Sequence, residues 1–198
     1  ESSPTEIANQ SDIDLVFLAL PHGVSFEYAE PLVKAGKMII DLSADFRLHS
    51  STNYKKYYDQ DHPASHLLDI SSYVLPELAD NDLKEDELIA CPGCYPTSIL
   101  IPVLPLIKSG VIDDVSLVIN SYSGVSGAGR EKADLLLKEN QDSLTAYGLP
   151  KHRHVSEIKE QLEKAACKDV NVQFCPHLAP FPRGIHTTIV VPTKKDID

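Results

Sequence analysis

The sequence has few of the features that mark specialised classes of protein. Its 198 residues include four Cys and no Trp, which is too little cysteine for a disulfide-held scaffold. No apolar run approaches the ~20 residues of a membrane-spanning helix, and we expect no signal peptide in the polar opening residues. Lys and Arg number 18 against 29 Asp and Glu, a net charge of -11. We therefore predict a cytoplasmic globular protein that binds neither nucleic acid nor membrane.

Apolar runs in the first half of the chain predict a parallel sheet. The run IDLVFLAL (13–20) is apolar without alternation, which is typical of a strand buried on both faces. A helix is expected over 26–35, capped by Ser25, although Pro31 should kink it or delay its start. A second buried strand, KMIIDLS (37–43), follows. Strand, helix and strand within about 30 residues predict a parallel βαβ unit.

The rest of the chain predicts a different arrangement. Residues 49–72 are polar with several Tyr and His, and we expect a long, partly ordered connection there. The further elements expected are a helical turn and strand over 81–90, helices over 97–109, 131–140 and 156–166, and strands over 115–123, 170–174 and 186–192. Because regular alternation ends near residues 91–110, we assign residues 1–93 to one domain and 94–198 to another.

Two cysteines at a strand end raise the question of chemistry. Cys94 follows Gly93 and begins a predicted helix, where free N–H groups and the helix dipole favour a thiolate. We expect Cys94 to be a nucleophile and Cys91 to be buried and inert. Two alternatives remain open: a redox dithiol, or a Cys₃His zinc site completed by Cys175 and His177.

A nucleophilic thiol needs an acid/base partner, and the segment KHRH supplies two imidazoles. His152 and His154 flank Arg153 just before a predicted helix. Residues two apart at a helix start point in different directions, so we expect one ring near Cys94 and the other turned away or holding the loop. We favour His154 as the acid/base. The planar guanidinium suits carboxylate and phosphate, so the arginines are either an anion site or unrelated surface residues. They are Arg47, Arg130, Arg153 and Arg183.

Six motifs together resemble the N-acetyl-gamma-glutamyl-phosphate reductase family of arginine biosynthesis. They are LALPHG, DLSADFRL, PGCYPT, SGVSGAGR, AYGLPKHRH followed by EI, and FCPHLAPFPRG, spread over residues 13–192. The chain departs from the family at Cys91, where Asn is usual, and at Val74, where Gly is usual. The family's opening glycine-rich loop should precede residue 1, and a C-terminal return segment should follow residue 198. We therefore expect this chain to be the middle of a longer protein.

The resemblance implies a fold, a reaction and a set of site residues. The fold would be α/β, with a truncated NADP-binding Rossmann-type parallel sheet followed by an α+β substrate and oligomerisation domain with a mixed sheet. The reaction would be NADPH-dependent reduction of an acyl phosphate, N-acetylglutamyl 5-phosphate, through a Cys94 thioester, with His154 or His152 exchanging protons, in a homodimer or homotetramer.

Further residues are implied in binding. The loop after residue 122 is expected to offer backbone N–H groups to phosphate. Substrate contacts are implied for Ser123, Arg47, Arg130, Arg153 and Arg183, and cofactor contacts for Pro21, His22, Gly23, Ser126, Gly127, Ala128 and Gly129. Two alternatives remain: a sister reductase acting on aspartyl or aminoadipyl phosphate, and a zinc-binding module.

Overall fold

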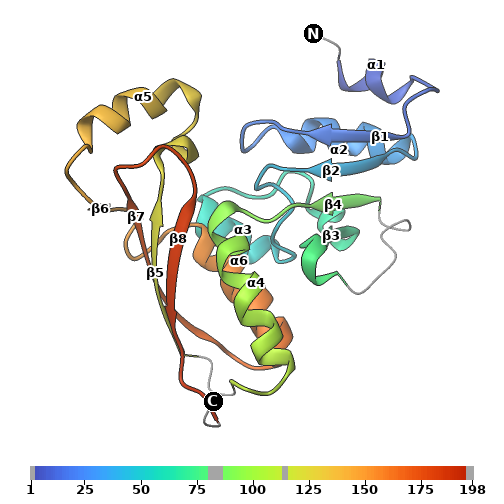
Figure 1. Cartoon of the computed structure of the whole chain (residues 1–198). Helices are drawn as coiled ribbons and strands as arrows, with labels where there is room; N and C mark the ends of the chain where they lie inside the picture. Colours follow the sequence, from blue (N-terminus) through green and yellow to red (C-terminus); the bar gives the residue numbers. More distant parts are fainter. Residues whose placement is uncertain (1–2, 80–86, 113–115, 195–198) are drawn as a thin grey trace. The chain divides into compact units, whose positions relative to one another are not determined.

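The computed structural model describes residues 3–79, 87–112 and 116–194, which belong to two compact units, residues 1–93 and 94–198. Each unit has its own four-stranded sheet (Figure 1). The first sheet is parallel and the second is mixed, which confirms the predicted α/β class.

The first unit is a parallel sheet with strand order β1-β2-β4-β3. Its elements are α1 (Pro4–Ala8), β1 (Leu15–Leu18), α2 (Ser25–Lys34), β2 (Met38–Asp41), α3 (Ser51–Tyr58), η1 (Ser65–Asp69), β3 (Ser71–Tyr73), η2 (Pro76–Leu78) and β4 (Leu88–Ala90). Because the strands are parallel, the loops that follow β1, β2 and β4 gather at one edge of the sheet. In open parallel sheets this carboxyl edge is where ligands bind.

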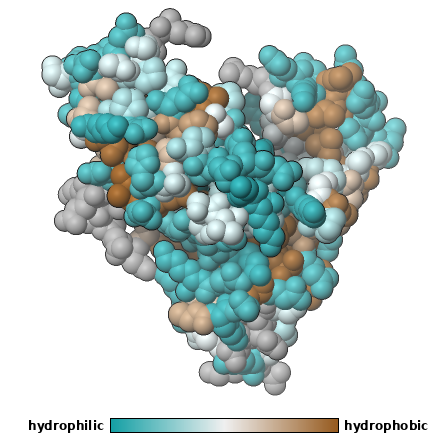
Figure 2. Space-filling model, turned by 180° about the vertical axis from the view of Figure 1, so that it is seen from behind, coloured by the Kyte–Doolittle hydropathy of each residue, from teal (hydrophilic) through white to brown (hydrophobic). Residues whose placement is uncertain are grey.

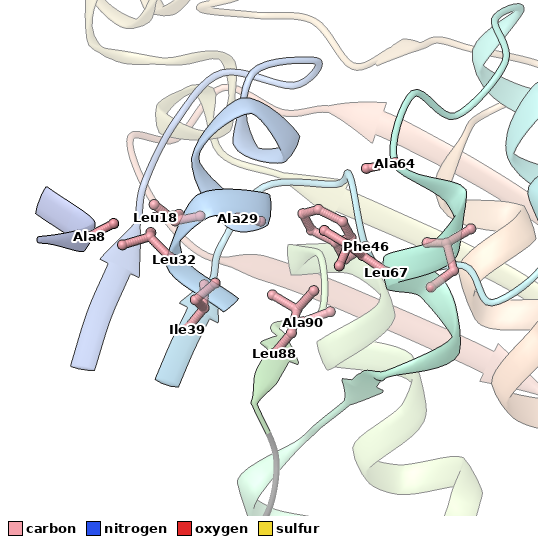
Figure 3. Packing of buried hydrophobic residues seen from close by; sticks show 11 residues of the cluster. Ala8, Leu18, Ala29, Leu32, Ile39, Phe46, Ala64, Leu67, Leu88 and Ala90 are labelled. Atoms are coloured by element: carbon pink, nitrogen blue, oxygen red, sulfur yellow. The ribbon is translucent and has the colours of Figure 1, made fainter. Parts of the chain in front are cut away.

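Apolar side chains from strands, helix and loop form the core of this unit. Leu32 of α2, Ile39 of β2 and Leu88 of β4 are fully buried, together with Phe46 from the loop after β2. Figure 3 shows these side chains converging, with Leu67 of η1 beside Phe46. Burial of a side chain of this size contributes about 1.5–3 kcal/mol. The core therefore fixes the loop after β2 as firmly as it fixes the strands.

Two local predictions for this unit are wrong. Segment 49–72 is more ordered than the partly ordered connection expected, because α3 and η1 form within it and Tyr54 is completely buried. Ser25 does not cap α2: it is the first helical residue, and its hydroxyl donates to Asp41. Pro31 lies inside α2 without delaying its start. The helical turn expected over 81–86 lies outside the described residues.

The second unit is a mixed sheet with strand order β6-β7-β5-β8, in which β5 and β7 are parallel. Its elements are α4 (Cys94–Lys108), β5 (Ser116–Ser123), η4 (Val125–Ala128), α5 (Arg130–Glu139), β6 (Thr145–Ala146), α6 (His154–Ala166), β7 (Asn171–Leu178) and β8 (Ile185–Val190). Helices α4 and α6 lie side by side, and each contacts the sheet (Figure 1). Helix α4 begins at Cys94 and α6 begins at His154.

The surface is mixed in character. On the face drawn in Figure 2, hydrophilic areas predominate and hydrophobic areas are interspersed among them. Strand β5 alternates between buried Leu117 and Ile119 and exposed Val118. Within the described ranges, no helix combines the length and apolar character needed to cross a membrane.

Candidate active site

Cys94 occupies the first position of α4 and is exposed. A thiol at a helix N-terminus is next to unpaired N–H groups and the positive end of the helix dipole, which stabilise the thiolate. Pro96 falls in the first turn, where its missing N–H costs no helical hydrogen bond. Cys94 therefore begins a helix, as the sequence predicted, and its side chain is accessible to a ligand.

Cys91 has a different environment. Burial raises the pKa of the Cys91 thiol, and the nearby Arg47 offsets this only in part. All four cysteines are free thiols. A protonated, half-buried thiol is a poor nucleophile, so the geometry favours Cys94 for covalent chemistry.

A cavity of about 460 Å³ lies beside Cys94 in the second unit. It is formed by the starts of α4 and α6, the turn η4, and residues of α5, β6 and β7. The sequence-predicted site residues that line it are Cys94, Ser123, Gly127, Ala128, His152, Arg153 and His154. Segments more than 50 residues apart in the chain thus contribute to one hollow of a size suited to a small ligand.

Two tyrosines that the sequence analysis did not single out also line the cavity. The hydroxyl oxygens of Tyr95 and Tyr147 lie 2.8 Å apart. Burial raises the pKa of both hydroxyls, and the charge of an ionised Cys94 raises both further. Cys94 lines the same cavity as both tyrosines, whose hydroxyls stay neutral near pH 7. Their positions next to Cys94 and within AYGLPKHRH were the available signal.

His152 is enclosed by aromatic rings. Its ring lies edge-on to Tyr95, Tyr147 and Phe174, with centroid distances of 5.6, 5.5 and 5.5 Å. Gly148, at φ +66°, lies directly against it: a Cβ at that position would be 2.9 Å from His152 Cδ2. The glycine in AYGLP therefore makes room for the histidine four residues later.

The protonation state of His152 follows from these contacts. Burial, with a smaller contribution from Arg153, lowers the pKa of His152 to about 4. His152 Nδ1 accepts the backbone N–H of His154 at 3.2 Å, so the proton of the neutral ring is on Nε2. His152 is thus a neutral ring that holds the loop before α6.

His154 is the first residue of α6, and its ring also lines the cavity. The ring centroid is 4.9 Å from that of His152 and 5.8 Å from that of Tyr95. Neither imidazole is turned away from the cavity, so the two rings differ in how they are held rather than in direction.

The glycine-rich loop after β5 does not offer the N–H groups expected of it. The N–H groups of Gly124, Val125 and Ser126 donate to the carbonyls of Gly184, Phe181 and Pro182. A Cβ at Gly124 would lie 2.7 Å from the backbone nitrogen of Arg183, so only glycine lets these loops meet. The expectation that the loop of Ser123, Gly124, Ser126 and Gly127 offers backbone N–H groups to a phosphate is therefore wrong for Gly124 and Ser126, because the neighbouring loop uses those two N–H groups.

The three arginines whose side chains the structure describes have different surroundings. Arg153 lines the cavity, whereas Arg183 is exposed on the loop bonded to the glycine-rich turn. Arg47, in the first unit, is buried and donates to the carbonyls of Cys91 and Leu42 at 2.7 and 2.9 Å. Arg130 begins α5, but its side chain lies outside the described part of the structure.

The predicted cofactor residues of the first unit lie in the loop after β1. Pro21, His22 and Gly23 follow the carboxyl end of that strand. Gly23 has φ +86°, and a Cβ there would meet no atom within 4 Å, so the backbone is open on that side. This position fits a dinucleotide, which binds along the carboxyl edge of a parallel sheet. Across the described residues, no group of three or more His, Cys, Asp or Glu side chains is arranged to bind a metal ion.

Two family models match the chain. Residues 1–86 match the NAD binding domain of semialdehyde dehydrogenase, and residues 94–198 match its dimerisation domain. The chain belongs to the semialdehyde dehydrogenase family.

Within that family the resemblance to N-acetyl-gamma-glutamyl-phosphate reductases is confirmed. The reductase of Akkermansia muciniphila is 46% identical over 197 residues, which are 99% of this chain and 57% of that protein. The reductase of Pseudomonas fluorescens (strain Pf0-1) is 45% identical over 188 residues, 94% of this chain and 55% of that protein. The chain spans about half the length of the curated relatives it matches.

Solved structures with the same fold are aspartate semialdehyde dehydrogenases. Enzyme II from Vibrio cholerae, complexed with ASA, has a TM-score of 0.70 at 17% identity, covering 100% of this chain and 59% of that one. The Candida albicans enzyme with NADP has a TM-score of 0.63 at 13% identity, covering 93% and 52%. At these identities the likeness concerns the fold alone.

Proposed function

We propose that the protein carrying this chain reduces N-acetylglutamyl 5-phosphate to N-acetylglutamate 5-semialdehyde, with NADPH as reductant and phosphate as leaving group, in arginine biosynthesis. The observation that carries the proposal is one cavity that combines an exposed cysteine at a helix N-terminus with two histidines and two tyrosines. Identities of 41–46% to named reductases support the choice of substrate.

Cys94 performs the covalent step. Its thiolate attacks the acyl carbon, the carbon–oxygen bond to phosphate breaks, and a thioester forms as phosphate leaves. Bound NADPH supplies a hydride to the thioester carbon. The resulting thiohemiacetal then loses its hydroxyl proton and its carbon–sulfur bond breaks, which releases the aldehyde and regenerates the thiolate. Each step keeps the reacting carbon within reach of the α4 N-terminus.

His154 exchanges protons with the reacting oxygen. His152, with its pKa lowered to about 4, is uncharged near neutral pH and is a weak base, so it is the less suitable acid/base. It positions His154 instead, through the bond from the His154 N–H to His152 Nδ1. Of the paired Tyr95 and Tyr147 hydroxyls, the one that accepts the bond between them keeps its own proton to donate to the Cys94 thiolate. Arg153 supplies positive charge at the cavity for an anionic substrate.

The two units have different proposed roles. Residues 1–93 are the partial cofactor-binding domain, and residues 94–198 the substrate and oligomerisation domain, through which we propose a homodimer or homotetramer. The residues proposed to contact NADP are Pro21, His22, Gly23, Ser126, Gly127, Ala128 and Gly129, and those proposed for the substrate are Arg47, Ser123, Arg130, Arg153 and Arg183. Four free thiols suit the reducing cytoplasm.

The reverse reaction provides the test. The full-length protein is assayed for phosphate-dependent reduction of NADP with N-acetylglutamate, aspartate and aminoadipate semialdehydes. We expect N-acetylglutamate 5-semialdehyde to give the highest kcat/KM and the reaction to stop without phosphate. A preference for either of the other aldehydes would instead support the sister reductase.

A further inference from the structure

A fully buried carboxylate lies at the carboxyl edge of the parallel sheet. Asp45, in the loop after β2, has no exposed side-chain surface. Its carboxylate accepts the backbone N–H groups of Gly23 and Ser25 at 2.8 and 2.9 Å, and Nδ1 of His22 lies 2.7 Å from the same group. One side chain thus fixes the whole loop between β1 and α2.

This contact changes what the start of α2 can offer a ligand. The residue before the helix, Val24, makes no side-chain capping bond, and Asp45 supplies the missing acceptor from 20 residues away. A negative charge at a helix N-terminus is favourable, but it occupies N–H groups that would otherwise face an anion. A bound phosphate therefore has to find another donor here.

The ring of His22 offers a candidate donor beside this helix start. Its Nδ1 lies 2.7 Å from an Asp45 carboxylate oxygen, its ring lies 4.4 Å from that of Tyr58, and its side chain is 25% exposed. With one face against Tyr58 and Nδ1 against Asp45, Nε2 is the ring nitrogen left for a ligand.

The carboxylate beside His22 is ionised. Burial raises the pKa of Asp45, but bonds from His22, Gly23 and Ser25 outweigh this and lower the pKa overall, so Asp45 stays ionised. The other titratable groups packed here, Tyr54, Tyr58 and His62, are neutral: burial raises the pKa of Tyr54 and lowers that of His62, and Tyr58 is a phenol.

A hydrogen-bonded chain keeps Asp45 in place. The Asp45 N–H donates to Ser43 Oγ at 3.1 Å, and Ser43 and Ser25 both donate to Asp41, at 2.7 and 2.8 Å. These side chains are all buried. The carboxylate therefore cannot move away from the loop after β1 without breaking several buried bonds.

We propose that Asp45 is a positioning residue that fixes a protonated His22 with Nε2 directed at an anionic oxygen of the bound dinucleotide. The inference rests on the proposed function, because the ligand is the cofactor of that reaction. A carboxylate that merely capped α2 would affect stability and leave cofactor affinity unchanged.

The test is direct binding of NADPH to the full-length protein, without substrate, followed by NADPH fluorescence between about pH 6 and pH 8. In the wild type Kd should rise with pH, because the protonated ring binds and is lost at high pH. Asp45→Asn and His22→Gln should each raise Kd about 10-fold at low pH and flatten this profile. The double variant should be no weaker than either single variant, since Asp45 acts through His22. His66→Gln, a control that removes another histidine facing a carboxylate in this unit (Nε2 is 3.7 Å from Glu30), should leave Kd and its pH profile unchanged.

The remaining outcomes either support or overturn the positioning role of Asp45. If Asp45→Asn lowers stability but keeps Kd and the pH profile, Asp45 is a cap only and the proposal is overturned. If that variant does not fold, His22→Gln decides: a flat profile supports the proposal, and an unchanged one overturns it. A wild type that binds NADPH while both variants bind equally well defeats this inference alone. A wild type without affinity for NADPH defeats the proposed function and this inference with it.

Discussion

Replacing Gly148 by Ala tests whether the packing of His152 matters for turnover. Gly148 has φ +66°, and an Ala in this left-handed conformation costs about 1–2 kcal/mol. The added Cβ would also lie 2.9 Å from His152 Cδ2, against the ~3.5–4.0 Å of ordinary carbon contacts. The ring must therefore shift by roughly 0.6 Å or more, and it would disturb the bond to the His154 N–H.

Gly110→Ala is the matched control. Gly110 has φ +69°, but a Cβ there would meet no atom within 4 Å, so it shares the strain without the clash. In the full-length protein both variants should lose about 1–2 kcal/mol of unfolding free energy in urea. Gly148→Ala alone should also lose ~10–100-fold in kcat, since misplacing a catalytic group by a fraction of an ångström to 1 Å has effects of that order. Equal kcat values for the two variants would refute the argument.

Three further predictions concern the cavity. Cys94→Ser should abolish turnover while Cys91→Ser keeps most of it, measured by NADPH oxidation; equal damage would restore the dithiol alternative. His154→Asn should lower kcat by ~10²–10⁴-fold and abolish one limb of the pH–rate profile, whereas His152→Asn should keep both limbs. Because the pKa of His152 falls from 6.5 to about 4 on folding, the unfolded chain binds more protons in that window, and stability should decrease as pH drops through it. The full shift corresponds to ~3 kcal/mol, which partial solvent screening reduces to about 1–2 kcal/mol; urea titrations of wild type and His152→Asn should differ by that amount between about pH 6.5 and pH 4.

The sheets could be predicted because local pattern and tertiary burial agree there. The runs 13–20 and 37–43 are mostly apolar, and a strand of the parallel sheet lies within each. The strand in 37–43 is central, whereas β1 is at the end of the described sheet with Leu15 and Phe17 exposed, so the expectation that it is buried on both faces is wrong. Segment 49–72 failed because its order depends on distant partners. The ring of Tyr54 lies 6.0 Å from that of His22, and His62 packs against Phe46 with its Nε2 2.8 Å from the Asp45 carbonyl. Such contacts between separate segments leave no periodic signal in the sequence.

In the candidate site, too, some features could be predicted from the sequence and others could not. Cys94, His152 and His154 were recognisable because each residue type suits one chemical role and each stands at an element boundary. The hydrogen bonding of the glycine-rich loop was not, because a loop's N–H groups can face a ligand or another loop, and the partner segment 181–184 lies more than 50 residues away. The role of Asp45 was hidden for a similar reason, since its partners belong to a different strand's loop.

The central claim is that Cys94 carries the acyl group during the reaction. The full-length protein, incubated with N-acetylglutamyl 5-phosphate in the absence of NADPH, is digested at low pH and its peptides are weighed by mass spectrometry. We predict the mass of one N-acetylglutamyl group on the peptide that contains Cys94, removed by hydroxylamine or by later addition of NADPH, and missing in Cys94→Ala. Acylation of another residue, or full turnover by the Cys94→Ala protein, would contradict the account.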